Sequence, residues 1–149
     1  MYVAITRTLR EAGFRATPQR IAIYLTLANT RAHPCAEIVY QKLHDEFPSL
    51  SLNTVYKTLQ TFEELGLVRR LDTGEGMCRY DANTAPHTHF LCKACGRVLD
   101  IEYEGVQNMG AIRDYLVGYV RDSAGHMVCD YSLILQGYCN ECLEERDPR

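Results

Sequence analysis

The sequence predicts an α+β protein made of a helical N-terminal module and a small mixed α/β C-terminal module. Three observations lead to this expectation. Helical periodicity dominates the first half of the 149-residue chain, strand-like runs dominate the second half, and that half contains two Cys-x2-Cys pairs. A chain of this length suits one domain or two small ones, and we expect two modules, residues 1–82 and 83–149.

Helical spacing accounts for the start of the chain. Residues 2–13 form an amphipathic pattern that stops at Gly13. Thr17 and Pro18 are a capping residue followed by proline at the first helical position, so a second helix is expected to begin there. A short loop should therefore separate the first two helices.

Two further helices are expected before residue 67. The helical period returns between Cys35 and Phe47 and ends at Pro48, because proline cannot continue a helix. Ser51 can then cap a fourth helix, which Gly66 closes.

A hairpin is expected after these helices. In residues 67–81, LVRRLDTGEGMCRYD, two short strand-like runs flank the turn sequence Thr73-Gly74-Glu75-Gly76. Short helices followed by a small hairpin describe a winged helix-turn-helix domain. The second helix of such a motif enters the major groove of DNA.

The second half alternates strands with a helix. Strands are expected within residues 88–92, 97–103 and 130–139, and a helix within residues 105–122. This order predicts a small α/β module.

Composition narrows the class of protein. The chain has no apolar run long enough to cross a membrane and no apolar signal-peptide core, so we expect a cytoplasmic protein. Residues 1–80 carry ten basic and eight acidic side chains, a balance of +2, and residues 81–149 carry six and eleven, a balance of −5. This split permits nucleic-acid binding by the first half, although ordinary surface variation explains it about equally well.

Seven cysteines in a cytosolic chain are expected to be thiols or metal ligands rather than disulfides. Four of them form the pairs Cys92-x2-Cys95 and Cys139-x2-Cys142, and four thiolates complete a tetrahedral structural Zn²⁺ site. The alternatives are two unrelated pairs or a redox pair. The remaining thiols are expected to be buried packing residues, namely Cys35, Cys78 and Cys129.

Two histidines offer a second group of ligands. His87 and His89 lie two residues apart on an expected strand and therefore point the same way. Asp81 precedes them, and Asp100 lies on the next expected strand. Imidazoles mixed with carboxylates suit Fe²⁺, Mn²⁺ or Zn²⁺, although paired surface histidines explain the spacing nearly as well.

Motifs spread along most of the chain carry a resemblance to a known family. They are TPQR at 17–20, AHPCAEIVY at 32–40, NTVYKTLQTFEELGLV at 53–68, RYD at 79–81, HTHFLCKACG at 87–96, VLDI at 98–101 and GYCNEC at 137–142. In this order they resemble the ferric uptake regulator superfamily of metal-dependent repressors. Any single motif would be weak, but their joint presence is specific.

The resemblance implies two metal sites and a mechanism. The positions that match the structural zinc ligands are Cys92, Cys95, Cys139 and Cys142, and those that match the regulatory metal ligands are His33, Asp81, His87, His89 and Asp100. His33 belongs to the DNA-binding half. A metal that joins it to the other ligands would favour one conformer, and DNA would favour the same conformer.

The carboxylates separate branches of the superfamily. Iron-uptake regulators typically have glutamate where this chain has Asp81 and Asp100, whereas peroxide-stress repressors have aspartate at both positions. Similarity to the peroxide branch implies that Fe²⁺ reacts with H₂O₂, that His33 or His87 gains an oxygen atom, and that the repressor leaves DNA. Mn²⁺ would support DNA binding without this chemistry. The alternative is a repressor that senses iron or manganese availability.

The resemblance also implies a homodimer that binds pseudo-palindromic double-stranded DNA, with the second module as the dimerisation domain. The expected DNA contacts are Arg20, Asn53, Thr54, Tyr56 and Lys57, with Thr58 nearby and with Arg15, Arg69, Arg70 and Arg79 as further phosphate contacts. The apolar run from Tyr131 to Leu135 would supply a strand between subunits.

Two other classes compete with a repressor. A His/Asp metal site with an open position could activate water in a metalloenzyme, but no general base or substrate pocket accompanies these ligands, so we expect no enzyme. A protein-interaction module stabilised by zinc would have no role in DNA binding. In such a module Tyr56→Ala and Lys57→Ala would cause no DNA-related phenotype.

Overall fold

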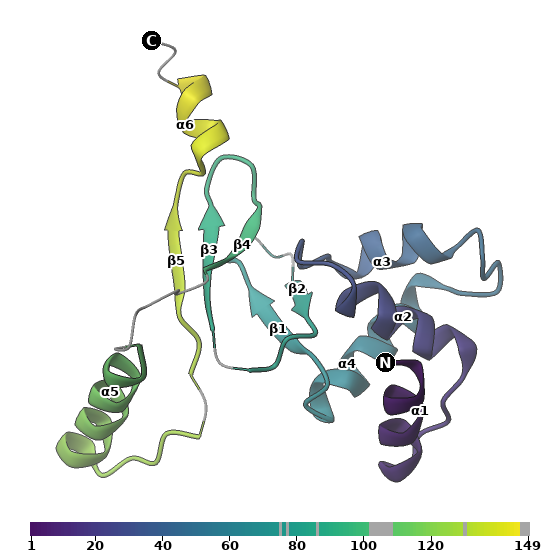
Figure 1. Cartoon of the computed structure of the whole chain (residues 1–149), viewed down its shortest axis with the longest axis horizontal. Helices are drawn as coiled ribbons and strands as arrows, with labels where there is room; N and C mark the ends of the chain where they lie inside the picture. Colours follow the sequence, from purple (N-terminus) through teal and green to yellow (C-terminus); the bar gives the residue numbers. More distant parts are fainter. Residues whose placement is uncertain (75, 77, 86, 102–108, 130, 147–149) are drawn as a thin grey trace. The chain divides into compact units, whose positions relative to one another are not determined.

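The computed structural model describes the chain except for residues 75, 77, 86, 102–108, 130 and 147–149. It divides into two compact units, Met1–Pro86 with Arg97–Leu99, and His87–Gly96 with Asp100–Arg149. The elements of the first part of the chain are α1 (Tyr2–Glu11), α2 (Pro18–Ala28), α3 (Ala36–Leu43), α4 (Leu52–Glu64), β1 (Arg69–Asp72) and β2 (Cys78–Asp81) (Figure 1). They are followed by β3 (Thr88–Cys92), β4 (Val98–Ile101), α5 (Met109–Ala124), β5 (Ile134–Gly137) and α6 (Asn140–Arg146).

Side-chain caps begin two helices of the first unit where the sequence predicted them. Thr17 Oγ1 accepts a hydrogen bond from the backbone N–H of Arg20, 3.3 Å away, and Pro18 is the first residue of α2. Ser51 Oγ accepts from the N–H of Thr54, 3.1 Å away, at the start of α4. Each cap satisfies an N–H group that has no partner within its own helix.

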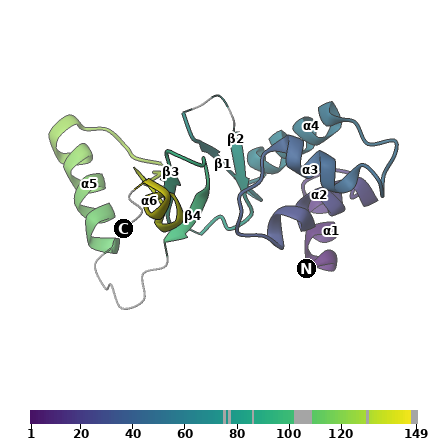
Figure 2. The ribbon, with the colours of Figure 1, turned by 90° about the horizontal axis from the view of Figure 1, so that it is seen from above.

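The four helices of the first unit pack around one another (Figure 2). Their apolar faces form one buried core, whose fully buried members include Leu9, Ile23, Val39, Val55, Leu59 and Phe62. Removing these side chains from water is the main stabilising contribution to the unit.

β1 and β2 form the antiparallel hairpin that the sequence predicted, with Arg69 opposite Asp81 and Asp72 opposite Cys78. The helices and this hairpin confirm the winged helix-turn-helix. The regular part of α3 ends at Leu43, four residues before the expected end at Phe47. Phe47 N still donates to the Leu43 carbonyl at 2.9 Å, so a turn carries the chain on to Pro48.

The second half of the chain contains a sheet with the strand order β4-β3-β5. β3 and β5 are parallel, and their register pairs His89 with Ile134 and Cys92 with Gly137. A Cβ atom on Gly137 would lie 3.1 Å from Cε2 of Phe90, so glycine permits close packing of these strands. The mixed α/β character predicted for this half is confirmed.

The elements of this half differ in extent from the expectation. The expected strand at 130–139 shortens to β5, and of the run Tyr131–Leu135 only Ile134 and Leu135 are in a strand. The expected helix at 105–122 is observed as α5, and its first expected residues lie outside the described ones. α6 was not expected, because seven residues are too few to show a clear helical period.

The three remaining thiols occupy different environments. Cys35 is buried at the N-cap of α3, as expected. Cys78 is half-buried and its Sγ accepts a hydrogen bond from Arg70 Nε at 2.9 Å. The expectation of burial is wrong for Cys129, which is exposed. Among the described residues, none of the helices combines the length and the apolar character that a membrane crossing requires.

Candidate metal centres and nucleic-acid interface

The four paired cysteines converge in the second unit. Cys92 ends β3, Cys95 lies in the following turn, Cys139 follows β5 and Cys142 lies in α6. Their sulfur atoms all lie within 4.8 Å of one another, and the Cys95 and Cys139 sulfurs are 3.9 Å apart. Tetrahedral zinc with bonds of about 2.3 Å holds its sulfurs about 3.8 Å apart, so these thiols fit Zn²⁺. The alternative of two unrelated pairs is therefore wrong.

Strand pairing explains why the two cysteine pairs meet. The parallel register of β3 and β5 places Cys92 beside Gly137, and Lys93 N donates to the Gly137 carbonyl at 2.7 Å. Two residues after Gly137, the backbone N–H of Cys139 lies 3.3 Å from Cys92 Sγ. The sheet therefore aligns both pairs at one end of these strands.

Backbone N–H groups favour the thiolate form that a metal needs. The N–H groups of Cys95 and Cys139 lower the pKa of the Cys92 thiol to about 6, because each stabilises the negative sulfur. Hydrogen bonding to the Cys139 sulfur raises the pKa of Cys142 to about 12, since the neighbouring sulfurs share its proton. When a divalent cation such as Zn²⁺ binds the four sulfurs, it displaces the proton that Cys142 carries in the metal-free site.

The first unit contains one pair of the predicted regulatory ligands. His33 Nε2 lies 3.6 Å from Asp81 Oδ2, and the two side chains are only 2% and 8% exposed. The Asn83 N–H donates to the other carboxylate oxygen, Asp81 Oδ1, at 2.7 Å. That bond orients the carboxylate so that Oδ2 faces the imidazole.

The backbone at His33 is held in an uncommon conformation. Its φ of 46° is in the left-handed region, which residues other than glycine rarely adopt. Arg79 Nη1 donates to the His33 carbonyl at 3.2 Å, and Tyr80 N donates to the Pro34 carbonyl at 3.2 Å. Both donors belong to β2, so the strand that carries Asp81 also holds the segment that carries His33.

The second unit contains the other three predicted regulatory ligands. Asp100 Oδ1 lies 3.3 Å from His87 Nε2 and 3.6 Å from His89 Nε2. The two imidazole rings have centres 4.3 Å apart, as expected for side chains on the same face of the chain at β3. Ligands about 2.1 Å from one ion can be separated by up to about 4.2 Å, so this triad suits Fe²⁺, Mn²⁺ or Zn²⁺.

α4 presents one exposed face with the predicted DNA contacts. Asn53, Tyr56 and Lys57 are exposed, and Thr54 is half-buried beside the Ser51 cap. Thr58 is only 3% exposed and packs with the core, so its side chain does not belong to this face. The role of these residues in DNA binding stays a prediction.

Arg20 has a structural contact that the sequence did not indicate. Its Nη1 donates to the Arg15 carbonyl at 3.0 Å, and its guanidinium lies 5.8 Å from the centre of the Phe14 ring. These contacts hold the loop between α1 and α2. Contact between Arg20 and DNA also stays a prediction.

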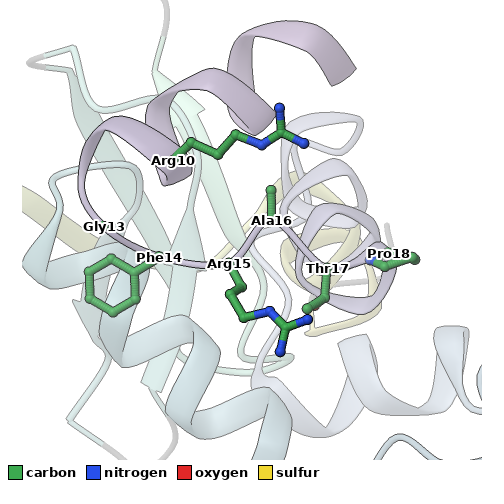
Figure 3. A pocket seen from close by; sticks show the side chains of 7 residues that line it. All are labelled: Arg10, Gly13, Phe14, Arg15, Ala16, Thr17 and Pro18. Carbon is green, nitrogen blue, oxygen red and sulfur yellow. The ribbon is translucent and has the colours of Figure 1, made fainter.

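A shallow depression of about 510 Å³ lies over the same loop. Arg10 and Arg15 line it together with Gly13–Pro18. Figure 3 shows the Arg10 side chain extending from the end of α1 and that of Arg15 from the following loop, with Ala16 between them in this view. Two guanidinium groups at one exposed loop are suited to phosphate contacts.

Comparison with known proteins agrees with this architecture. The model of the ferric uptake regulator family matches residues 11–116. The peroxide operon regulator of Bacillus subtilis (strain 168) is 36% identical over 140 residues, which cover 94% of this chain and 92% of that protein.

Two solved structures are similar over nearly the whole chain. The ferric uptake regulator of Helicobacter pylori has a TM-score of 0.76 at 18% identity, covering 97% of this chain and 93% of that one, and this likeness concerns the fold. The Campylobacter jejuni peroxide stress regulator has a TM-score of 0.68 at 26% identity, covering 95% and 98%. The chain belongs to the ferric uptake regulator family.

Proposed function

We propose that the protein is a metal-dependent, DNA-binding transcriptional repressor that senses hydrogen peroxide. The observation that carries this proposal is the donor set: each unit holds histidine and aspartate side chains at ligand spacing, with aspartate at both carboxylate positions. The similarity to a peroxide operon regulator over most of both chains supports the same assignment. A family of transcriptional regulators gives no reason to expect turnover of a substrate.

The two sets of ligands are proposed to act on one ion. His33 and Asp81 would bind it from the first unit, and His87, His89 and Asp100 from the second. An ion bound by both sets restricts the orientation of the units. If DNA selects that same orientation, the ion and DNA strengthen each other's binding reciprocally.

The regulatory site is proposed to hold Fe²⁺ or Mn²⁺, and bound Fe²⁺ supplies the capacity to reduce H₂O₂. One oxygen atom of H₂O₂ enters the imidazole of His33 or His87 and the other leaves as water, so a two-electron oxidation of histidine balances a two-electron reduction of peroxide. The modified ring is a poorer donor. The affinity of the site for metal falls, and the affinity for DNA falls with it.

The partners follow from the two modules. Residues 1–82 are proposed to bind double-stranded DNA through Arg20, Asn53, Thr54, Tyr56 and Lys57. Residues 83–149 are proposed to form the homodimer, so that two α4 helices read a pseudo-palindromic operator. The cytoplasm, where DNA and reduced thiols occur together, is the proposed location.

Peptide mass spectrometry tests the sensing step. The full-length protein, loaded with Fe²⁺ without oxygen, receives a brief H₂O₂ pulse, and an Mn²⁺-loaded sample is the control. We expect one added oxygen on His33 or His87 in the iron sample alone, with loss of DNA binding. The exposed His126 serves as an internal control for unspecific oxidation.

Unmodified histidines with retained DNA binding would contradict peroxide sensing. The aspartates would then tune metal affinity, and the protein would be a repressor that responds to iron or manganese availability. Equal oxidation of His126 and the two ligands would also contradict a sensor, because site-directed chemistry is selective.

A further inference from the structure

One hydrogen bond joins the face of α4 that carries the predicted DNA contacts to α3. The Tyr56 hydroxyl donates to Glu37 Oε1, across 19 positions of sequence. Glu37 lies in the first turn of α3 and Tyr56 in the second turn of α4, and both belong to the first unit. The bond therefore ties a side chain of the exposed face to a neighbouring helix.

The ring and the hydroxyl of Tyr56 have different surroundings. Tyr56 is 42% exposed as a residue, so its ring is accessible, while its hydroxyl is held by a carboxylate. Tyr56 and Glu37 line a cavity of about 440 Å³ together with Asn53, Lys57 and Gln60. Glu37 is thus part of the surface that α4 presents.

The electrostatics keep this pair in its hydrogen-bonded form at neutral pH. The Tyr56 hydroxyl is the largest cause that lowers the pKa of Glu37, followed by the backbone N–H of Glu37 and the Cys35 side chain. The same bond raises the pKa of Tyr56 to about 12. The carboxylate is therefore ionised and the phenol protonated, which makes the bond charge-assisted.

We propose that Glu37 is a positioning residue for sequence recognition: by holding the Tyr56 hydroxyl, it directs the ring rather than the hydroxyl toward the base edges. This inference rests on the proposed DNA-binding function. A hydroxyl that donates its hydrogen to Glu37 cannot donate it to a phosphate. A ring that is already held in one orientation loses less conformational entropy when DNA binds. The ring then offers an apolar surface, which suits the methyl group of a thymine.

The alternative role of Glu37 is electrostatic alone. Its negative charge on this face repels phosphates, and a repelling charge weakens binding to every sequence equally. A positioning role instead changes the preference for thymine, and it acts only when the Tyr56 hydroxyl is present. These two consequences can be separated by experiment.

The test uses the full-length, zinc- and Mn²⁺-loaded protein and a duplex that it selects from a randomised library. The affinity for this duplex is compared with that for the same duplex with uracil in place of thymine, which removes only the methyl groups. We expect Glu37→Ala and Tyr56→Phe each to reduce the thymine preference about three- to fivefold, the factor for one buried methyl group. The double variant should show no further loss.

Two further variants make the result specific. Glu37→Gln removes the charge but keeps an acceptor oxygen, and we expect it to retain most of the thymine preference. Glu46→Ala removes the same charge from an exposed site just after α3 and should leave the preference unchanged. Zinc content and thermal midpoint establish that each variant is folded.

Several outcomes would overturn the inference. Equal weakening of both duplexes by Glu37→Ala would assign Glu37 an electrostatic role only. Identical behaviour of Glu37→Gln and Glu37→Ala, or additive losses in the double variant, would show that Glu37 does not act by holding the Tyr56 hydroxyl. If the wild-type protein selects no duplex, the proposed function fails and this inference fails with it. If the wild-type protein selects a duplex but Glu37→Ala leaves the thymine preference unchanged, the inference fails while the proposed function stands.

Discussion

Nε2 of His33 lies 3.6 Å from Oδ2 of Asp81, with both side chains almost completely removed from solvent. The two residues are 48 positions apart, and hydrogen bonds from β2 to the carbonyls of His33 and Pro34 hold them together. A buried imidazole beside a buried carboxylate is an arrangement suited to a cation. Both residues belong to the first unit, so this arrangement does not depend on the ligands of the second unit.

Replacement of Asp81 should separate metal regulation from zinc binding. We expect Asp81→Ala to weaken Mn²⁺ binding by a factor of about 10 to 100, because it removes an anionic donor and leaves His33 without its orienting neighbour. Metal-dependent DNA binding, measured by fluorescence anisotropy across an Mn²⁺ titration, should shift by the same factor. Zinc content should stay unchanged.

Asp72→Ala is the matched control, since it removes an exposed aspartate from the neighbouring strand β1. An unchanged Mn²⁺ titration in Asp81→Ala would show that Asp81 is not a ligand. Loss of zinc in that variant would instead indicate unfolding.

Loss of one zinc ligand should destabilise the second unit. We expect Cys139→Ser to abolish zinc retention and to lower the thermal midpoint by more than about 10 °C, because a structural zinc site contributes folding free energy directly. Zinc is measured by atomic absorption and unfolding by circular dichroism. Cys129→Ser removes an exposed thiol outside the four and should change neither quantity. Full zinc content in Cys139→Ser would exclude the four-thiolate site.

The Tyr56–Glu37 bond should be visible in an alkaline titration. The pKa of Tyr56 is raised to about 12 from the ordinary value of 10.0 for tyrosine, with Glu37 as the main cause. A raised pKa contributes stability that is fully present below pH 10 and is lost as the pH rises toward 12. At pH 11 we therefore expect Tyr56 to be mostly protonated in the wild type and mostly ionised in Glu37→Ala.

Tyrosinate absorbance measures this difference. Two difference curves isolate the signal of Tyr56 from that of the other tyrosines. The first is the wild-type titration minus that of Tyr56→Phe, and the second is the Glu37→Ala titration minus that of the double variant. Identical curves in the two backgrounds would mean that Glu37 does not hold the hydroxyl in solution.

The cap of α4 should contribute measurably to stability. Ser51 Oγ accepts from Thr54 N, and Ser51→Ala should cost about 1 kcal/mol of unfolding free energy, as is typical of a lost N-cap. Ser49→Ala removes only an exposed hydrogen bond from Gln19 and should change stability by less than about 0.5 kcal/mol. Urea unfolding measures both variants, and equal values for the two would contradict a specific role of the cap.

Features that depend on neighbouring residues were predictable from the sequence. Thr17, Pro18 and Ser51 begin their helices because a cap needs only the next three residues, and the hairpin follows from turn residues between two short strands. The Cys-x2-Cys spacing likewise identifies thiolate pairs. Local chemistry thus determined the order of elements and the kinds of ligand.

Tertiary structure decided which distant residues meet. The two cysteine pairs are separated by 43 residues, and only the parallel pairing of β3 with β5 brings them together. Arg20 holds a loop, Thr58 turns into the core and Tyr56 binds Glu37 because helices pack on particular faces. Periodicity shows that a helix has an apolar face, but not which side chain of another helix lies opposite each residue, since that depends on packing between segments far apart in sequence.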